Sequence, residues 1–172
     1  MNAVWLGVGS NCHALDNLAS CLDALLLQFR DLALSSVYES AAAGQQGQPY
    51  LNMVVGLQTD MPLLQLNKLL KSLEQKHGRR EQGQGDVPLD IDILLYANKA
   101  GNFDGITLPR PEILTAPYVL CPLAQVAGKQ KHTVSKTSYS DLWEAFDKSA
   151  VSISAVDFTW HERRISHAAT VV

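Results

Sequence analysis

Apolar and polar residues alternate with the period of a β-strand in two segments. In residues 3–9, Val4, Leu6 and Val8 share one face. In residues 50–58, one face carries Leu51, Met53, Val55 and Leu57, and the other carries Tyr50, Asn52 and Val54. Each pattern predicts a strand with one face in the core, and the second strand keeps a polar face that a ligand can contact.

Two more segments show the same alternation. Residues 31–39 place Leu32 and Leu34 on one face. Residues 89–96 read LDIDILLY, with Leu89, Ile91, Ile93 and Leu95 expected in the core. Both segments are predicted to be strands, which makes four in total.

Two stretches have the apolar spacing of a helix. The first follows Asp16, which we expect to cap it. The second begins near Pro62, a favoured position in a first turn, and ends near Gly78. Their apolar stripes are Leu18, Leu22, Leu25, Leu26 and Phe29, and Leu63, Leu66, Leu70 and Leu73.

The resulting order, strand, helix, strand, strand, helix, strand, is the ferredoxin-like βαββαβ pattern. It predicts an α+β fold with a mostly antiparallel sheet and helices on one face, leaving the other face for ligands or added elements. Residues 40–49 and 79–88 are predicted loops.

The rest of the chain is expected to add C-terminal elements to this core. Residues 107–122 form a proline-bounded segment, 139–146 a short amphipathic helix and 151–157 a possible last strand. We expect a single domain over 1–160. From Trp160 the sequence has no clear place in the core, and 161–172 are predicted to be a mobile tail.

Composition narrows the possible partners. The chain has 172 residues, 47% of them hydrophobic and 18% charged, with a formal net charge of -3. There is therefore no global basic field to attract nucleic acid or an anionic membrane, and a polyanion such as ATP would need local cations or metal ions.

Cysteine content and the N-terminus indicate the cytoplasm. Three cysteines without a CxxC pair argue against a disulfide framework and a zinc site. The N-terminus lacks the basic and apolar regions of a signal peptide, and no stretch is long enough to span a bilayer. The oligomeric state is not predicted.

The sharpest chemical feature is the pair Asp90 and Asp92. Residues i and i+2 of a strand point the same way, so the two carboxylates project together and repel each other. Magnesium, which takes one or two carboxylates together with phosphate oxygens, would relieve that repulsion. The alternative is a solvated strand face.

Three weaker features accompany this pair. Asn11, in a Gly-Ser-Asn turn after the first strand, can donate and accept hydrogen bonds, although such a turn can be purely structural. Tyr50 can stack on a flat heterocycle and Asn52 can read its edge, or the two can form a packing pair. Glu74, beside the second apolar stripe, is more simply a solvated glutamate.

Taken together in this order, several segments resemble the 6-hydroxymethyl-7,8-dihydropterin pyrophosphokinase family of folate biosynthesis. The resemblance extends from about residue 3 to about residue 123. The matching segments are VGSN (8–11), SSVYES (35–40), QPYLN (48–52), LEQKHGR (73–79), LDIDILLY (89–96), TLP (107–109) and YVLCPL (118–123).

The resemblance implies transfer of pyrophosphate from ATP to the hydroxymethyl group of the dihydropterin, leaving AMP. It implies that Asp90 and Asp92 hold two magnesium ions, and that Arg79 acts in catalysis. The implied pterin contacts are Ser40, Tyr50, Asn52 and Tyr118, to which we add Asn11. The implied ATP contacts are Glu74, Arg79, Arg80 and Arg110.

The chain departs from the family pattern at several basic positions. Arg110 replaces a histidine, and two arginine positions fall near Gly105 and at Ala116. Each missing arginine removes charge-assisted contacts to phosphate. Three hypotheses follow: an active pyrophosphokinase with an altered nucleotide pocket, a divergent paralogue that binds a pterin or related heterocycle with weak or no ATP chemistry, and a ferredoxin-like interaction module.

Overall fold

A computed structural model describes residues 1–40, 48–78, 85–149 and 151–168 of the chain. Its main sheet has the order β5-β1-β4-β3-β8, with β2 also paired to β4, and every pairing is antiparallel. The strands are β1 (Asn2–Ser10), β2 (Ala33–Leu34), β3 (Tyr38–Ser40), β4 (Tyr50–Thr59), β5 (Asp90–Tyr96) and β8 (Ile153–Ala155).

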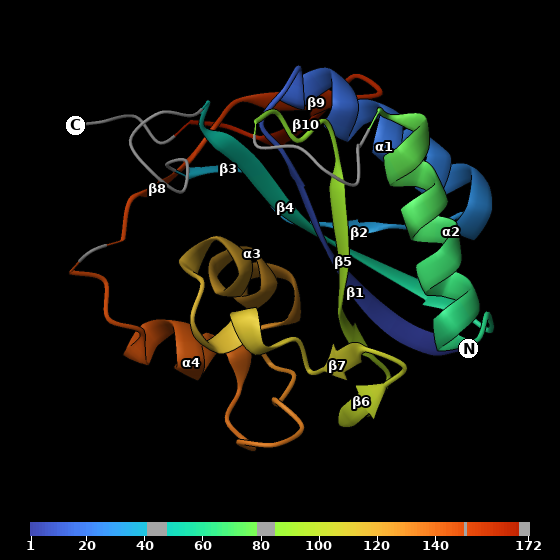
Figure 1. Cartoon of the computed structure of the whole chain (residues 1–172). Coiled ribbons are helices and arrows are strands. Elements are labelled where there is room, and N and C mark those ends of the chain that lie inside the picture. The colour runs from blue at the N-terminus through green and yellow to red at the C-terminus, as the bar shows by residue number, and fades with distance from the viewer. Residues whose placement is uncertain (41–47, 79–84, 150, 169–172) are drawn as a thin grey trace.

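Helices α1 (Ala14–Phe29) and α2 (Leu63–Lys76) complete the βαββαβ order and lie together on one face of the sheet (Figure 1). The main core lies beneath them. Its buried residues include most of the apolar stripes of both helices and most of the predicted inward faces of β1 and β4, and Leu26, Phe29, Leu51 and Leu73 pack against it partly buried. The α+β, ferredoxin-like class is therefore confirmed, because both the order of elements and the antiparallel pairing agree with it.

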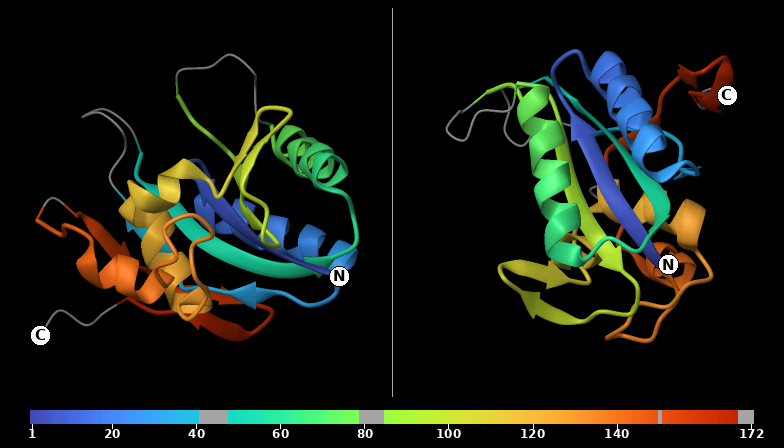
Figure 2. Two further views of the ribbon diagram at one scale, coloured as in Figure 1. Left: turned by 90° about the horizontal axis from the view of Figure 1, so that it is seen from below. Right: turned by 90° about the vertical axis from the view of Figure 1, so that its right-hand side faces the viewer.

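The opposite face carries η1 (Pro111–Leu114), α3 (Pro117–Ala127) and α4 (Tyr139–Ala145), as the views of Figure 2 also show. A second cluster of buried apolar residues joins α3 to this face. The helix α3 was missed in the sequence, where its segment appeared irregular. Pro117 suits a first turn, but Pro122 has no N–H to donate within the helix, so only burial against the sheet outweighs that loss. The short helix predicted near 139–146 is confirmed as α4.

Details of three predicted elements were wrong. Asp16 does not cap α1; the cap is His13, with φ of 45° and no side-chain hydrogen bond, and Asp16 lies in the first turn. The single strand expected over 31–39 is two short strands, β2 and β3. Leu95 is buried, but it packs in the second cluster rather than the main core. A register shift in the β1–β5 pairing reverses the direction in which this side chain points at the end of β5.

The chain continues past the central fold in two hairpins. One pairs β6 (Gly101–Phe103) with β7 (Ile106–Leu108), and the other pairs β9 (Phe158–Trp160) with β10 (Arg163–Ser166). Trp160 is 8% exposed and donates from its indole nitrogen to Asp23 of α1 at 2.9 Å. The expectation that the segment from Trp160 has no place in the core was therefore wrong for Trp160 itself. The mobility expected of 161–172 stays a prediction.

No helix within the described ranges has the length and apolar content needed to cross a membrane. The cysteines Cys12, Cys21 and Cys121 carry free thiols, and Cys21 is fully buried in the main core. Burial raises the pKa of the Cys21 thiol to about 12, so this cysteine serves as a small apolar core residue.

Candidate functional site

A pair of glycines opens the middle of the sheet on the face that α3 covers. Gly7 pairs across the ladder with Asp92, and Gly9 pairs with Asp90. On their other side the same glycines pair with β4, where Gly9 lies opposite Asn52. A Cβ at Gly9 would lie 2.9 Å from Oδ1 of Asn52, so only glycine leaves the amide and the carboxylates facing a common space.

That space is a cavity of about 350 Å³, within the range of small-molecule sites. It lies between the sheet and the segment that runs from Arg110 into α3. Its lining residues are Gly7, Val8, Gly9, Ser40, Tyr50, Asn52, Met53, Val54, Asp90, Asp92, Leu94, Arg110, Glu112, Tyr118 and Val119. Seven of the predicted site residues therefore meet in one cavity, namely Ser40, Tyr50, Asn52, Asp90, Asp92, Arg110 and Tyr118.

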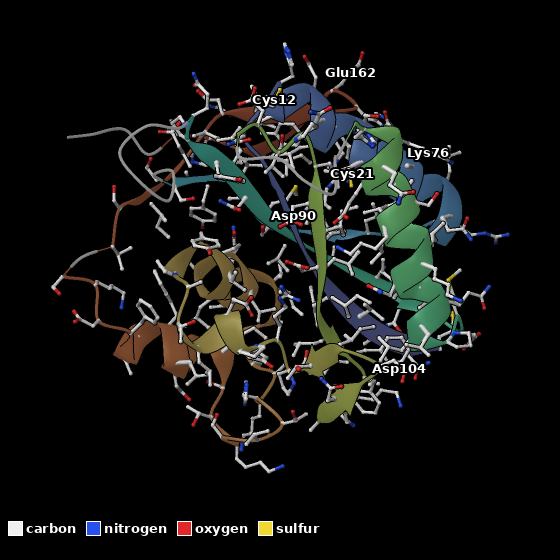
Figure 3. All side chains as sticks on the ribbon, in the orientation of Figure 1. Cys12, Cys21, Lys76, Asp90, Asp104 and Glu162 are labelled. Atoms are coloured by element: carbon white, nitrogen blue, oxygen red, sulfur yellow. The ribbon has the colours of Figure 1, made fainter. Side chains whose placement is uncertain are left out.

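Asp90 and Asp92 both project into this cavity from β5, as their i, i+2 spacing predicted. Figure 3 labels Asp90 on β5, far from Asp104 at the opposite end of the sheet. Burial raises the pKa of Asp92, and the neighbouring Asp90 raises it further, while Arg110 and Lys71 lower it. The pair is therefore a concentration of negative charge in a half-buried site, which is the property that attracts a cation.

The donor chemistry of this pair fits magnesium. Two carboxylates on one strand face, with glycine opposite each of them, supply oxygen ligands and leave room for phosphate and water. Within the described ranges, no group of three or more His, Cys, Asp or Glu side chains is arranged to hold a metal ion. Two carboxylates leave most of the coordination positions of a magnesium ion open, so Asp90 and Asp92 would share it with oxygens of a bound substrate.

Arg110 is a cation that faces Asp92. Its Nη2 lies 3.3 Å from Oδ2 of Asp92 and 3.2 Å from Oε1 of Glu112. Its backbone N–H donates to the carbonyl of Leu94 at 2.9 Å, which ties the start of η1 to β5. Prolines on both sides restrict the backbone further, so the position of the Arg110 Cα is firmly set.

The other end of the cavity is aromatic and uncharged. Asn52 donates from Nδ2 to the hydroxyl of Ser40 at 2.9 Å, which orients the amide across β4 and β3. Tyr50, two residues earlier on the same face of β4, and Tyr118, in the first turn of α3, contribute aromatic rings to the lining. A flat heterocycle with a polar edge matches such a lining.

Two predicted site residues lie outside the cavity. Asn11 instead forms a reciprocal pair with Val87: its Oδ1 accepts from the Val87 N–H at 2.5 Å, and its own N–H donates to the Val87 carbonyl at 3.0 Å. These two hydrogen bonds hold the segment before β5 against the end of β1. Asn11 therefore has a structural role, which is the alternative that the sequence left open for this turn.

Glu74 is not solvated, so that interpretation was wrong. Its side chain is 2% exposed. Its Oε1 accepts from the Ile91 N–H at 2.7 Å and from Nζ of Lys71 at 2.8 Å. Glu74 thus holds α2 against β5 between the two aspartates, because it binds the backbone of the residue that separates them.

Arg79 and Arg80 lie outside the described residues. Sequence reasoning missed Gly7, Leu94, Val119 and Glu112 as lining residues. The first two had a signal, since each lies at an even spacing from Gly9 or Asp92 on the same strand. Glu112 and Val119 had none, because they belong to the segment whose helices were not recognised.

Comparison with known proteins identifies the family to which the chain is similar. Residues 5–128 match the family model described as 7,8-dihydro-6-hydroxymethylpterin-pyrophosphokinase. The 2-amino-4-hydroxy-6-hydroxymethyldihydropteridine pyrophosphokinase of Haemophilus influenzae is 32% identical over 133 residues, which cover 74% of this chain and 83% of that protein. The protein of the same name from Synechocystis is 32% identical over 150 residues, covering 85% of this chain and 77% of its own.

Solved structures support the fold. A crystal structure of Plasmodium falciparum HPPK-DHPS with pteroate aligns with a TM-score of 0.76 at 12% identity. The alignment covers 96% of this chain, and the chain spans 47% of that longer protein. At this identity the likeness concerns the fold, and it extends through the C-terminal elements beyond residue 128.

Proposed function

The chain belongs to the 7,8-dihydro-6-hydroxymethylpterin-pyrophosphokinase family, and we propose that it transfers pyrophosphate from ATP to 6-hydroxymethyl-7,8-dihydropterin in a magnesium-dependent reaction. It is an enzyme of the transferase class that acts in folate biosynthesis. The products of the proposed reaction are AMP and the pterin diphosphate. The family match and the named relatives favour this activity over a paralogue that only binds a pterin.

One observation carries the proposal. The cavity has an acidic end, with Asp90 and Asp92, and an aromatic, uncharged end, with Tyr50 and Asn52, and the two ends are joined across the bare backbone of Gly9. A substrate with a flat heterocycle at one end and a reacting hydroxyl at the other spans such a cavity. Its hydroxyl would then meet a metal-bound phosphate at the carboxylates.

The acidic end would bind the nucleotide through magnesium. Asp90 and Asp92 would hold two ions, which neutralise charge on the transferred group when bound. The carboxylates have to be ionised for this task, and Arg110 helps to keep Asp92 ionised because it lowers the pKa of that carboxyl. Arg110 would also donate to phosphate oxygens.

The aromatic end would bind the pterin. Tyr50 and Tyr118 would pack on the ring faces, and Asn52 would hydrogen-bond the ring edge while Ser40 holds the amide in place. Burial of the ring excludes water from the hydroxymethyl group, which favours transfer to the pterin over hydrolysis of ATP.

The remaining predicted residues would act around this cavity. We propose that Arg79 and Arg80 contact the phosphates, with Arg79 acting in catalysis. The resemblance implies that Glu74 contacts the nucleotide, but Glu74 is buried against Ile91 and Lys71, so we propose that it acts on the nucleotide site through the strand that carries Asp90 and Asp92. Asn11 would influence substrate binding through the Val87 segment that it holds. Support for these four assignments comes from the resemblance and, for Asn11, from its contact with the chain that leads into β5.

The test is AMP formation from ATP and magnesium with and without 6-hydroxymethyl-7,8-dihydropterin. We expect AMP only when the pterin is present, with no ADP. Asp90→Asn should abolish turnover, and Asp104→Asn is the matched control, since Asp104 is an exposed aspartate at the far end of the sheet whose φ of 50° asparagine tolerates. ADP as the product, or full activity of Asp90→Asn, would refute the proposal.

A further inference from the structure

Arg110 lies at the acidic end of the cavity, and its guanidinium is permanently charged. It contacts Asp92 at 3.3 Å and Glu112 at 3.2 Å, and its side chain is 32% exposed. A histidine is the family's usual residue here, so a side chain that is always charged replaces one that is neutral above its pKa. The positive charge beside Asp92 is therefore present at every pH at which the protein is folded.

The place that Arg110 occupies is one that a metal ion would also need. A cation that neutralises the pair formed by Asp90 and Asp92 has to approach their oxygens from the cavity side, and Oδ2 of Asp92 already faces a guanidinium from that side. A divalent cation and Arg110 would then stand close together within a half-buried site, where like charges repel strongly. The metal ion and Arg110 cannot both be close partners of the same carboxylate without an unfavourable free energy of repulsion.

Glu112 gives Arg110 a second anchor. Both carboxylates form an ion pair with the same nitrogen, Nη2, so the guanidinium lies between them. The backbone of Arg110 is held by the hydrogen bond from its N–H to the Leu94 carbonyl, so any change of partner has to come from the side chain. A side chain with two ion-pair partners can leave one of them and keep the other, which lowers the cost of the movement.

We infer that Arg110 is the internal counter-cation of Asp92 in the metal-free enzyme, and that it exchanges this partner for nucleotide phosphate when magnesium binds. Arg110 thus weakens binding of the metal alone and strengthens binding of the metal together with the nucleotide. The consequence is ordered loading: the site resists a lone divalent cation and accepts it as a complex with ATP. The inference rests on the proposed function for the identity of the nucleotide.

The opposite signs of these two effects provide the test. Binding of Mn²⁺, an ion with the same preference for oxygen ligands, is measured without nucleotide from the electron paramagnetic resonance signal of the unbound ion. We expect Arg110→Gln to tighten Mn²⁺ binding by about tenfold, since it removes a nearby like charge. The same variant should weaken binding of α,β-methylene-ATP with magnesium, measured by calorimetry, by about tenfold or more.

Two further variants separate charge from folding. Arg110→Lys keeps the positive charge, so its Mn²⁺ affinity should stay within about threefold of the wild type. Arg164→Gln is the matched control, because it breaks another Arg–Asp contact, the 2.9 Å pair with Asp157, on the C-terminal hairpin. It should change neither affinity.

The outcomes are decisive in both directions. Mn²⁺ binding that is unchanged or weaker in Arg110→Gln, or absent from every variant, would overturn the inference, as would tightening by Arg110→Lys to the same degree. Unchanged nucleotide binding in Arg110→Gln would also overturn it. If the wild type forms no AMP but the two opposite shifts are observed, the proposed reaction fails while the exchange of partners stands.

Discussion

The two faces of the strands β1, β4 and β5 have the same backbone but opposite properties. The face under α1 and α2 is apolar and buried, with side chains such as Leu6, Val55 and Ile91 at 0–1% exposure. The face under α3 carries two glycines, an amide and two carboxylates around a cavity. Because side chains alternate along each strand, one set of strands supplies both the core and the site.

This division separates stability from chemistry at the level of single residues. Ile91 lies between Asp90 and Asp92, yet it belongs to the main core while they line the cavity. Its backbone N–H donates to Glu74, so a contact on the core face also positions the two carboxylates on the opposite face. The core face should therefore respond to substitution through unfolding, and the site face through activity.

The largest expected effect is on the site face. Asp92→Asn removes half of the proposed metal-binding pair while keeping the size of the side chain. We expect a loss of pterin-dependent AMP formation of about 10³-fold, because metal stabilisation of the transferred group is worth several kcal/mol. The midpoint of thermal unfolding without magnesium should not be lowered. Burial and the neighbouring Asp90 both disfavour the charged form of Asp92 in the wild type, so its loss removes an unfavourable interaction. A lowered midpoint would show that the pair stabilises the fold.

On the core face we expect a large effect of the opposite kind. Leu66→Ala truncates a fully buried side chain of α2 in the main core. It should lower the free energy of unfolding by about 3 kcal/mol, measured by urea denaturation. AMP formation per folded molecule should stay close to the wild type, and Leu64→Ala, a partly exposed neighbour, is the matched control. A large loss of activity in the folded fraction would break the separation of the two faces.

Two glycines on the site face should respond differently. Gly9→Ala places a Cβ 2.9 Å from Oδ1 of Asn52, the end of a side chain that can turn away, so stability changes little but the pterin contact is lost. We expect the KM for pterin to rise by about tenfold. Gly56→Ala places its Cβ 2.4 Å from the ring of Trp5, which is packed in place, so it should destabilise the protein instead. Similar KM changes in both variants would contradict this contrast.

The smallest effect concerns the layer that covers the site face. His132, in the loop between α3 and α4, is buried, and its Nδ1 accepts from the N–H groups of Val134 and Ser135. Burial lowers the pKa of His132 below its usual 6.5. The unfolded chain then binds the proton more readily, so stability from this group is full above about pH 6.5 and falls as the pH drops towards the folded pKa.

His132→Gln should remove this part of the pH dependence. The measurement is the denaturant midpoint of both proteins between pH 7.5 and 5, in which the wild type should lose more stability than the variant. Parallel curves for the two proteins would show that His132 does not contribute to the acid sensitivity of the α3–α4 layer.

Most of the fold was predictable because its signals are local. The alternation in β4 and β5 and the leucine stripes of α1 and α2 each require only neighbouring residues, and all four elements are confirmed. The faces of β4 were also predicted correctly, with Tyr50 and Asn52 opposite the core. The single strand predicted over 31–39 was wrong, because pairing with β4, and not the local pattern, decides which of its residues form the two short strands.

The site was predictable only where it follows strand periodicity. Asp90, Asp92 and Asn52 needed nothing but the i, i+2 rule to be placed on the ligand-facing side. The partners of buried polar groups were not predictable in this way. Glu74 has the sequence context of a surface glutamate, and the backbone N–H that it binds is 17 residues away.

By itself, the sequence determined the order of elements, the inward and outward faces of the strands and the pairing of two carboxylates on one face, because all of these depend on side-chain periods of 2.0 and 3.6. Only the tertiary structure decided that α3 covers the site, that Trp160 returns to the core, and that Arg110 lies between Asp92 and Glu112. These features depend on contacts between distant segments, whose free energy comes from burial and charge pairing that no local pattern records.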